Sequence, residues 1–222
     1  MSDKMISFNR ASFEGMAGGE SGAKNFSFRP WTLWEKPVSN HSNDHDHYQS
    51  ATRCLSRITN IEEFWKYWLC VPQPSELFEG KHFVRESDTT VGALVQIDTL
   101  MLFREGVRPE WEDPANSTGG HLQYMFKTTG INPALLDEYW NNIAMGLLGG
   151  MIEPCDMVTG IRLLDKSTVG RNNGVRIEVW FRDFHETEKI NQLRQSLENC
   201  MCKRADGTHG NVPKCEIKSH SM

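Results

Sequence analysis

The stretch Val175-Arg-Ile-Glu-Val-Trp-Phe181 decides the fold class, because its side chains alternate strictly between two kinds. Four apolar residues, beginning with Val175, would face one side, and Arg176, Glu178 and Trp180 would face the other. Successive side chains of a β-strand point to opposite faces of a sheet, so this period predicts a strand with one buried face. Such strands are typical of antiparallel sheets that are covered on one face only.

Runs of apolar, β-branched and aromatic residues predict further strands upstream. An aromatic run at Phe28–Trp34 contains Pro30, which restricts the run to a sheet edge or to the start of a strand. Strands and helices do not alternate regularly, so the sequence predicts an α+β protein whose antiparallel sheet is packed by helices on one face. The remaining predicted strands are His82–Arg85, Ala93–Phe103, Leu122–Phe126 and Thr159–Leu164.

Three helices are predicted from apolar residues at helical spacing. Asn60 and Glu63 form a capping box ahead of the first helix. The pair Asn132 and Pro133 supplies the cap and first turn of the second, which ends at Gly149. The predicted helices cover about 61–70, 132–148 and 186–202.

Composition excludes several classes of protein. The 222 residues include 24 Lys plus Arg and 29 Asp plus Glu, for a formal net charge of −5. No window approaches the roughly 18 apolar residues of a membrane span, and no export signal opens the chain, so we expect neither membrane contact nor secretion. Residues 160–222 nevertheless carry 11 basic and 8 acidic groups, which favours a local site for an anionic ligand. The six widely spaced cysteines predict reduced thiols.

The domain organisation follows from local composition. Residues 1–24 are polar and glycine-rich, which predicts a flexible N-terminal tail. Residues 25–202 hold the predicted strands and helices and form one domain. The polar segment 203–222 is predicted to be an irregular C-terminal tail.

A tryptophan lies among acids and prolines in the segment Glu105-Gly-Val-Arg-Pro-Glu-Trp111-Glu-Asp-Pro114. A loop aromatic beside a carboxylate indicates a clamp of ring and hydrogen bonds. The Glu112 carboxylate can accept the two parallel N–H donors on the Watson–Crick edge of guanine. The Trp111 indole can stack on the base for about 1–3 kcal/mol. Methylation at N7 makes the base cationic, and cation–π attraction then adds roughly 0.5–2 kcal/mol.

This segment and several others, in the same order, resemble the eukaryotic translation initiation factor 4E family, which binds the mRNA 5′ cap. The resemblance covers about residues 26–200. It implies a curved antiparallel sheet of about eight strands with three long helices packed on the convex face, and no catalysis. The matching motifs are Trp31-Thr-Leu-Trp34, Ile61-Glu-Glu-Phe-Trp65, Phe103 to Asp113, Gly119-Gly120, Trp140 with Leu147-Leu148-Gly149, and Val175 to Trp180.

The resemblance implies a cap slot of two aromatic rings and one glutamate. Trp111 matches one ring and Glu112 the glutamate that reads the guanine edge. The second ring lies seventeen residues before Trp65, at Tyr48. Most members have tryptophan there, so the smaller phenol predicts weaker cap affinity. The residues implied for the phosphates are Lys166 and Arg176, with Arg171 as a weaker addition and His121 contributing little when it is neutral.

The resemblance also implies a dorsal surface for partners, namely a scaffold of the initiation factor 4G type or a 4E-binding protein. Trp65 is its anchor, and Ile61 and Met145 match further contact positions. Asn142, with Asn141 before it, replaces a common leucine–glutamate pair, which should alter partner choice. The region near 72–92 is longer than in typical members and would be an insertion for an unusual partner or regulatory contact.

Structural explanations compete with these roles. Trp111 would otherwise pack at a rim, Lys166 and Arg176 would be surface charges, and Trp65 would be part of the core. Aromatic residues of strands and helices usually fill the core, so no function is assigned to Trp31, Trp34, Trp140 and Trp180.

Two tracts offer metal ligands, but we expect no metal. The segment His41–His47 supplies imidazole and carboxylate groups, yet a polar loop explains it as well. Cys200-Met-Cys202, with His209 and Cys215, has zinc-type donors without the usual C-x2–4-C start. No nucleophile motif, phosphate loop or HExxH helix appears, which argues against an enzyme.

The sequence therefore predicts a cytoplasmic, and in part nuclear, monomer that binds capped mRNA and a dorsal partner and uses no cofactor. The alternative is an interaction protein of the same family whose cap affinity is weak or lost and which acts through its dorsal face. Tyr48, Leu122 and Asn142 motivate that alternative. A third reading, a metal-dependent enzyme, would require stoichiometric metal.

Overall fold

The computed structural model describes residues 5–7, 28–38, 52–87, 90–127, 130–166, 174–204 and 206–221. Tyr48, Arg171 and the segment His41–His47 lie outside the described residues. In chain order, the elements are β1 (Met5–Ser7), β2 (Trp31–Pro37), β3 (Arg53–Ile58), α2 (Ile61–Trp68), η2 (Pro74–Gly80), β4 (His82–Glu86), β5 (Leu94–Arg104), β6 (Gly120–Lys127), α3 (Pro133–Leu148), β7 (Val158–Asp165), β8 (Gly174–Phe181), α4 (Thr187–Met201) and β9 (Cys215–Ser219).

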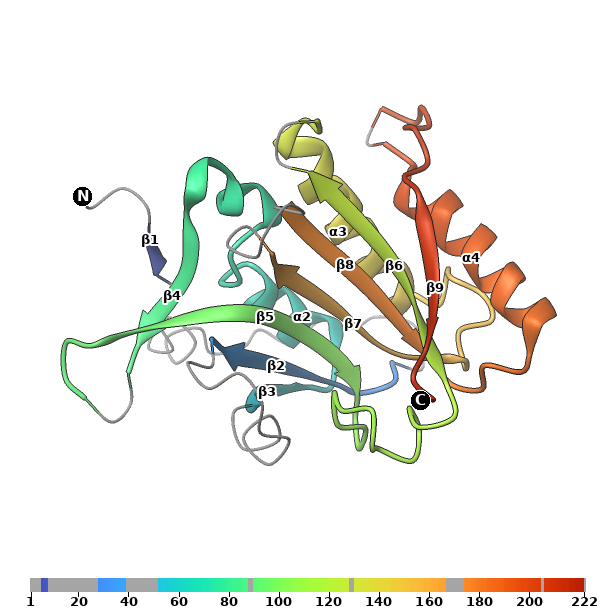
Figure 1. Cartoon of the computed structure of the whole chain (residues 1–222), viewed down its shortest axis with the longest axis horizontal. Helices are drawn as coiled ribbons and strands as arrows, with labels where there is room; N and C mark the ends of the chain where they lie inside the picture. The colour runs from blue at the N-terminus through green and yellow to red at the C-terminus, as the bar shows by residue number, and fades with distance from the viewer. Residues whose placement is uncertain are drawn as a thin grey trace.

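The strands in these ranges form one nine-stranded sheet. Its path runs β1-β4-β5-β7-β8-β6-β9, and β2 and β3 branch from β5 (Figure 1). Paired strands are antiparallel, except that β1 runs parallel to β4. β2 pairs with residues 97–104 of β5, whereas β7 and β4 pair with residues 99–103 and 94–97 along its other edge. The predicted antiparallel sheet is confirmed, and Pro30 directly precedes a strand as expected.

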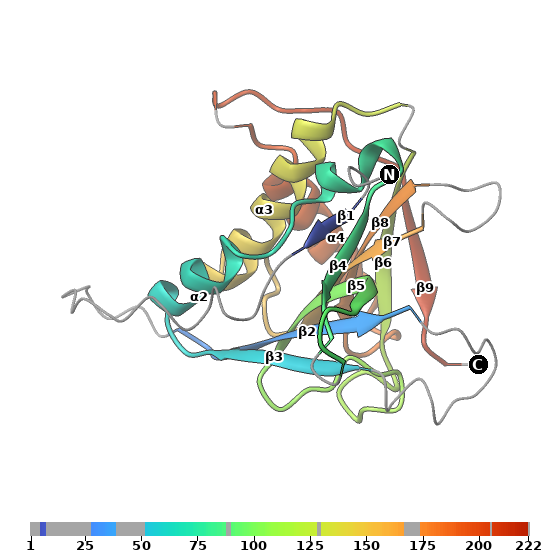
Figure 2. The same ribbon diagram turned by 90° about the vertical axis from the view of Figure 1, so that its left-hand side faces the viewer.

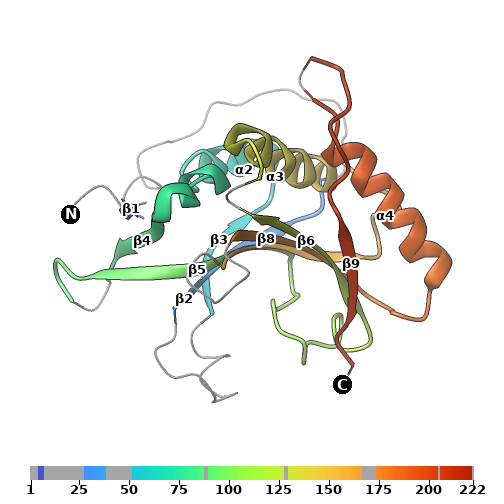
Figure 3. The same cartoon turned by 45° about the horizontal axis from the view of Figure 1, so that its top comes forward.

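Helices α2, α3 and α4 cover one face of the sheet, which curves away from them (Figures 2 and 3). The apolar residues of β8, from Val175 to Phe181, belong to the core under these helices, whereas Arg176 and Glu178 line the opposite face. The α+β fold with helices on the convex face is therefore confirmed. α2 has only eight residues, so it is shorter than the other two helices. Among the described helices, none has the length and apolar character that crossing a bilayer requires.

The first helix starts at its predicted cap, with one difference in the capping box. The Asn60 side chain accepts a hydrogen bond from the Glu63 backbone N–H at 2.8 Å. The Glu63 carboxylate accepts from the Thr59 N–H and hydroxyl, at 2.7 Å each, rather than from Asn60. α2 ends at Trp68, and a turn replaces its predicted last two residues.

The prediction of an irregular C-terminal tail at 203–222 is wrong for one segment. Cys215–Ser219 form β9, which pairs with Gly120–Tyr124 of β6 along the edge that β8 does not use. Gly120 permits this approach, because a Cβ there would lie 2.3 Å from the carbonyl oxygen of Lys218. Charged residues interrupt the apolar pattern of β9 and its partner lies far upstream, so local sequence did not reveal the strand.

Part of the described segment near 72–92 belongs to the sheet, because β4 is one of its strands, whereas η2 is a short helix outside it. Arg85 of β4 forms an ion pair with Glu35 of β2, whose carboxylate is fully buried. His82 Nδ1 lies 2.9 Å from an Asp165 carboxylate oxygen at the end of β7. Through these two contacts, β4 is linked to β2 and to the end of β7.

Candidate functional site

A pocket of about 450 Å3 is lined by side chains on the face of the sheet opposite the helices. This face is the concave one (Figure 3). Strands β2, β5, β6, β7, β8 and β9 contribute to it, together with Trp111 from the loop before β6. Its charged residues are Lys36, Arg162, Lys166, Arg176 and Lys218, with Asp98 and Glu178; the remaining lining residues are Thr99, Trp111, His121, Gln123, Leu164 and Ser219.

Strand alternation and one bulge point these side chains into the pocket. Arg176 and Glu178 lie on the polar face predicted for β8. In β5, Thr99 pairs with Lys36 and Ile97 with Pro37, so Asp98 is an extra residue. A β-bulge re-aims the side chains around it. Asp98 and Thr99 consequently both line the pocket.

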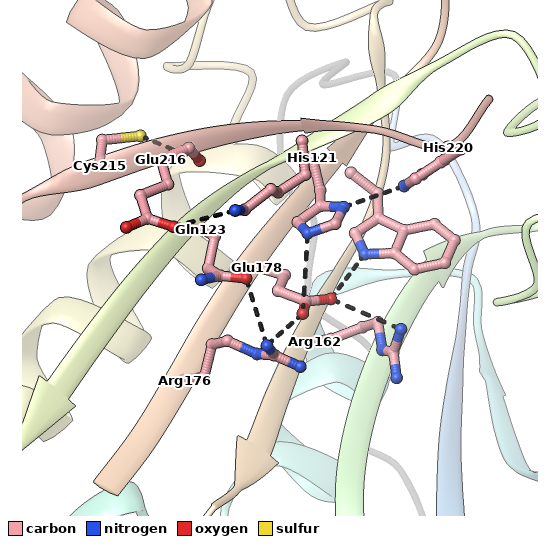
Figure 4. A network of polar contacts seen from close by, with 10 residues as sticks. His121, Gln123, Arg162, Arg176, Glu178, Cys215, Glu216 and His220 are labelled. Carbon is pink, nitrogen blue, oxygen red and sulfur yellow. Dashed lines mark hydrogen bonds and ion pairs between the residues drawn. The ribbon is translucent and has the colours of Figure 1, made fainter. Parts of the chain in front are cut away.

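Glu178 is the centre of a polar network at the floor of the pocket (Figure 4). Its carboxylate lies 3.0 Å from Arg176 Nε and 3.5 Å from Arg162 Nη1, and it accepts a hydrogen bond of 2.9 Å from Trp180 Nε1. Burial alone would raise the pKa of Glu178, but the nearby Arg162, His121 and Arg176 outweigh burial and hold its pKa below the ordinary value. Glu178 is therefore ionised at neutral pH and fixes both guanidinium groups.

Lysine side chains bring further positive charge to the end of the pocket near β7. Burial lowers the pKa of both Lys36 and Lys166, and the Asp98 carboxylate partly offsets this effect at each. The pocket lining thus contains five cationic side chains against two carboxylates. An excess of positive charge in a concave site favours an anionic ligand.

Two uncharged histidines lie near Trp111: His121 lines the pocket, and His220 stacks against His121 behind the lining. His220 Nδ1 lies 2.9 Å from the Asn116 carbonyl oxygen, so this nitrogen carries the hydrogen. His220 Nε2 then accepts from His121 Nδ1 at 3.1 Å (Figure 4). Burial is the main reason that the pKa of each ring is lowered, for His121 to about 4. Both rings are neutral at pH 7.

The loop that carries Trp111 is held by its own polar side chains. Asp113 accepts from the Arg108 and Ala115 N–H groups at 2.8 Å each. The Asn116 side-chain amide donates to the carbonyl oxygens of Arg108 and Glu110, also at 2.8 Å. These bonds fix the loop while the Trp111 ring stays 43% exposed. The ring is thus both presented to solvent and positioned.

The structure brings together four of the predicted site residues. Trp111, His121, Lys166 and Arg176 all line the one pocket. Glu112 follows Trp111 in the loop and is exposed, but it does not line the pocket.

Sequence reasoning missed nine of the thirteen residues that line the pocket, and His220 behind them. Arg162 and Glu178 sit at alternate positions of strands β7 and β8, so their pattern could have indicated them. Lys36 follows an aromatic strand that was read only as a packing element. His220 has no sequence signal, because it reaches the site only through the unpredicted pairing of β9.

A second surface is exposed on the helical face. It consists of Ile61, Trp65 and Leu69 on one side of α2 and its following turn, and Met145 on α3; we call it the α2–α3 surface. Leu69 is 76% exposed and was not predicted, although it lies four residues after Trp65. Large exposed apolar residues at helical spacing are typical of a surface that binds a partner.

The two asparagines next to this surface make internal hydrogen bonds. Asn142 Nδ2 donates to the carbonyl oxygens of Met201 and Lys203, at 3.1 and 2.7 Å, at the end of α4. Asn141 Oδ1 accepts from Trp68 Nε1 at 2.7 Å. The structure thus gives Asn142 a role in helix packing, and its predicted contact with a partner stays a prediction.

The cysteines and the other potential metal ligands show no sign of a metal centre in the described part of the chain. All six cysteines are free in the structure, and their reduced state in the cell stays a prediction. Among the described residues, no group of three or more His, Cys, Asp or Glu side chains is arranged to hold a metal ion.

Comparisons with known proteins give one family. The family model described as "Eukaryotic initiation factor 4E" matches residues 28–209. Eukaryotic translation initiation factor 4E of Candida albicans is 30% identical over 174 residues, which cover 77% of this chain and 70% of that protein. Eukaryotic translation initiation factor NCBP of rice is 33% identical over 151 residues, which cover 68% of this chain and 55% of that protein. The chain thus spans only about half the length of the rice relative.

Two solved structures share the fold. One is the complex of C. elegans eIF4E-3 with the 4E-binding protein Mextli and cap analog, with a TM-score of 0.61, 19% identity, and coverage of 86% of this chain and 90% of that one. The other is Ascaris suum eIF4E-3 with an m2,2,7G cap, with a TM-score of 0.59, 18% identity, and coverage of 85% and 95%. The match over most of both chains agrees with the curved sheet and its three helices.

Proposed function

The chain belongs to the eukaryotic initiation factor 4E family, and we propose that its concave pocket binds the N7-methylguanosine 5′ cap of mRNA. Initiation factors of this family are not enzymes, so the proposed mechanism is recognition alone. The observation that carries the proposal is that Trp111 and a group of cationic side chains share one pocket of about 450 Å3. A cap offers a partner to both, because its cationic base can stack on the indole and its phosphates can pair with the cationic side chains.

The base would be held by Trp111 and its neighbour. The half-exposed indole offers a stacking face, and Glu112, adjacent in the same loop, would accept from N1–H and the 2-amino group of guanine. Tyr48 is proposed as the second ring of the sandwich. A methylated base carries positive charge, so the ring selects it over neutral guanine by cation–π attraction.

The phosphates would be bound by Lys166 and Arg176, with Arg171 as a proposed addition. Arg162 and Lys36 join them, because both line the same pocket. The guanidinium group of Arg176 is held in position. It pairs with Glu178 through Nε and donates from Nη1 to Gln123 Oε1 at 3.2 Å. Guanidinium groups held in this way pair with phosphate oxygens at little cost in side-chain entropy.

His121 would contribute shape rather than charge. Its Nδ1–H is used by His220, and its Nε2 faces Glu178 Oε1 at 3.9 Å. A neutral ring with this arrangement has no N–H left for a phosphate. We therefore place His121 in the wall of the slot.

The α2–α3 surface would recruit a scaffold or repressor. An amphipathic helix can lay its apolar face on Ile61, Trp65, Leu69 and Met145, as in helix-in-groove recognition. Such a partner would bind on the opposite side of the sheet from the cap. The protein would then act as a monomer in the cytoplasm, and in part in the nucleus, joining capped mRNA to its partner.

The second candidate function is an interaction protein with weak or lost cap affinity. One observation favours it: Glu178 pairs with two arginines of the pocket, and His121 is neutral, which reduces the net charge offered to phosphates. In that case the α2–α3 surface would carry the function.

Charge reversal at Glu112 separates the two candidates. We expect Glu112→Lys to abolish retention on N7-methyl-GTP resin, since the lysine cannot accept from the guanine edge. Trp65→Ala, a change on the opposite face, serves as the matched control and should be retained like the wild type. A wild-type protein that the resin does not retain would favour the second candidate, whereas equal retention of wild type and Glu112→Lys would contradict the proposed role of Glu112.

A further inference from the structure

His220, next to the C-terminal end of β9, is almost completely buried although the strand before it is exposed. Only 5% of the residue is accessible to solvent. Its ring lies among the aromatic rings of Trp111, His121 and Trp180, at centroid distances of 5.8, 5.3 and 4.3 Å. The rings of Trp111 and His220 are inclined by only 17°, so they are stacked.

His220 is also bonded to the loop that carries Trp111. Its Nδ1–H donates to the Asn116 carbonyl oxygen at 2.9 Å, and its backbone N–H donates to the Gly119 carbonyl oxygen at 3.0 Å. Asn116 in turn closes the loop by its side-chain bonds to Arg108 and Glu110. The imidazole therefore touches Trp111 directly and fixes the residues behind it.

The approach of the C-terminal strand depends on the Gly119–Gly120 pair. A Cβ on Gly119 would lie 1.9 Å from the Phe181 carbonyl oxygen, and one on Gly120 would lie 2.3 Å from that of Lys218. Both neighbours are backbone atoms, so neither could move aside easily. The two glycines thus allow β8 and β9 to close on the start of β6, which brings His220 behind Trp111.

We propose that His220 is a positioning residue of the cap slot, and that the C-terminal strand β9 is the element that sets the place of Trp111. This inference rests on the proposed cap-binding function. The ring backs the indole on one side and holds its loop by the hydrogen bond from Nδ1–H to Asn116, while the backbone N–H of His220 holds Gly119. Because the imidazole is uncharged at neutral pH, it adds no positive charge next to a ring that must attract a cationic base. Burial, the main cause of the lowered pKa of His220, supports this uncharged state.

The test compares His220→Ala and His220→Phe with the wild type, and Ser221→Ala as the matched control at the exposed next residue. The affinities for N7-methyl-GTP and for GTP are measured separately for each variant, and thermal unfolding reports the folded state. We expect His220→Ala to weaken N7-methyl-GTP binding by about tenfold, or about 1.4 kcal/mol, and GTP binding by less. The ratio of the two affinities should therefore fall, which general destabilisation would not cause.

The phenylalanine variant keeps the proposal testable if the alanine variant does not fold. Phenylalanine retains a ring against Trp111 but cannot donate to Asn116, so we expect an intermediate ratio of affinities. Unchanged affinities and an unchanged ratio in a folded His220→Ala or His220→Phe protein, with wild type binding normally, would overturn the role of His220 alone. No binding by wild type would overturn the proposed function, and this inference with it.

Discussion

The charge states of single side chains divide the pocket into two parts. Beside Trp111, His121 and His220 are neutral at pH 7. Toward the end of β7, Lys36 and Lys166 lie near Arg162. This division matches a ligand with a flat cationic base at one end and phosphates at the other. The same residues predict that the fold loses stability in acid.

His121 makes the stability of the protein depend on pH. Its pKa is about 4 in the folded chain and 6.5 in the unfolded chain, so between these values only the unfolded chain takes up the proton. The free energy of unfolding should therefore fall as the pH falls from about 7 to 4, by about 3 kcal/mol from this residue. The groups that face the ring are Glu178, His220, Arg162 and Arg176. Urea unfolding at several pH values, for wild type and His121→Gln, measures the contribution of His121 to the free energy of unfolding.

The difference in unfolding free energy between wild type and His121→Gln should shrink by about 3 kcal/mol from pH 7 to pH 4. His209→Gln, at an exposed histidine, is the control and should follow the wild-type curve. Parallel curves for wild type and His121→Gln would show that the His121 ring is not held neutral.

At the scale of elements, helix packing and strand pairing place the functional residues. Asn142 of α3 bonds to two carbonyl oxygens at the end of α4, so it joins these helices and also satisfies orphan carbonyl groups. The α2–α3 surface depends on the position of α3. A change at Asn142 should thus act on stability before it acts on a partner.

Asn142→Ala should lower the free energy of unfolding by about 1–2 kcal/mol, because it leaves two carbonyl oxygens without their donor. The midpoint of urea unfolding measures this change. Asn199→Ala, at an exposed position of α4, is the control and should change it little. An Asn142→Ala protein as stable as the wild type would mean that these hydrogen bonds add nothing to stability.

Sequence patterns correctly predicted the strands and helices that are specified by residues close together in the chain. The alternation of Val175–Phe181 and the caps at Asn60 and Asn132 identified their strand and helices, because period and capping act within a few residues. Strand β9 was not predicted, because it pairs with β6, which lies far away in the sequence, and because its own sequence is polar. The same holds for the site. Trp111 was predicted from its loop and family motif, whereas His220 could be recognised only from the pairing of β9 with β6.

At the scale of the whole molecule, the sheet separates two surfaces. The pocket lies on the concave face, and the α2–α3 surface lies on the helices of the other face. The main core between them is formed by both layers. Cap and partner would therefore bind at the same time without contact, and any coupling between them would pass through the packed sheet.

Titration with N7-methyl-GTP and, separately, with GTP while following tryptophan fluorescence tests the central claim most directly. Stacking on Trp111 should quench the emission, and Trp111→Phe should remove most of that response. We predict a preference of at least about tenfold for the methylated nucleotide, or about 1.4 kcal/mol, because only the methylated base is cationic. No binding, or equal affinity for the two nucleotides, would contradict the account.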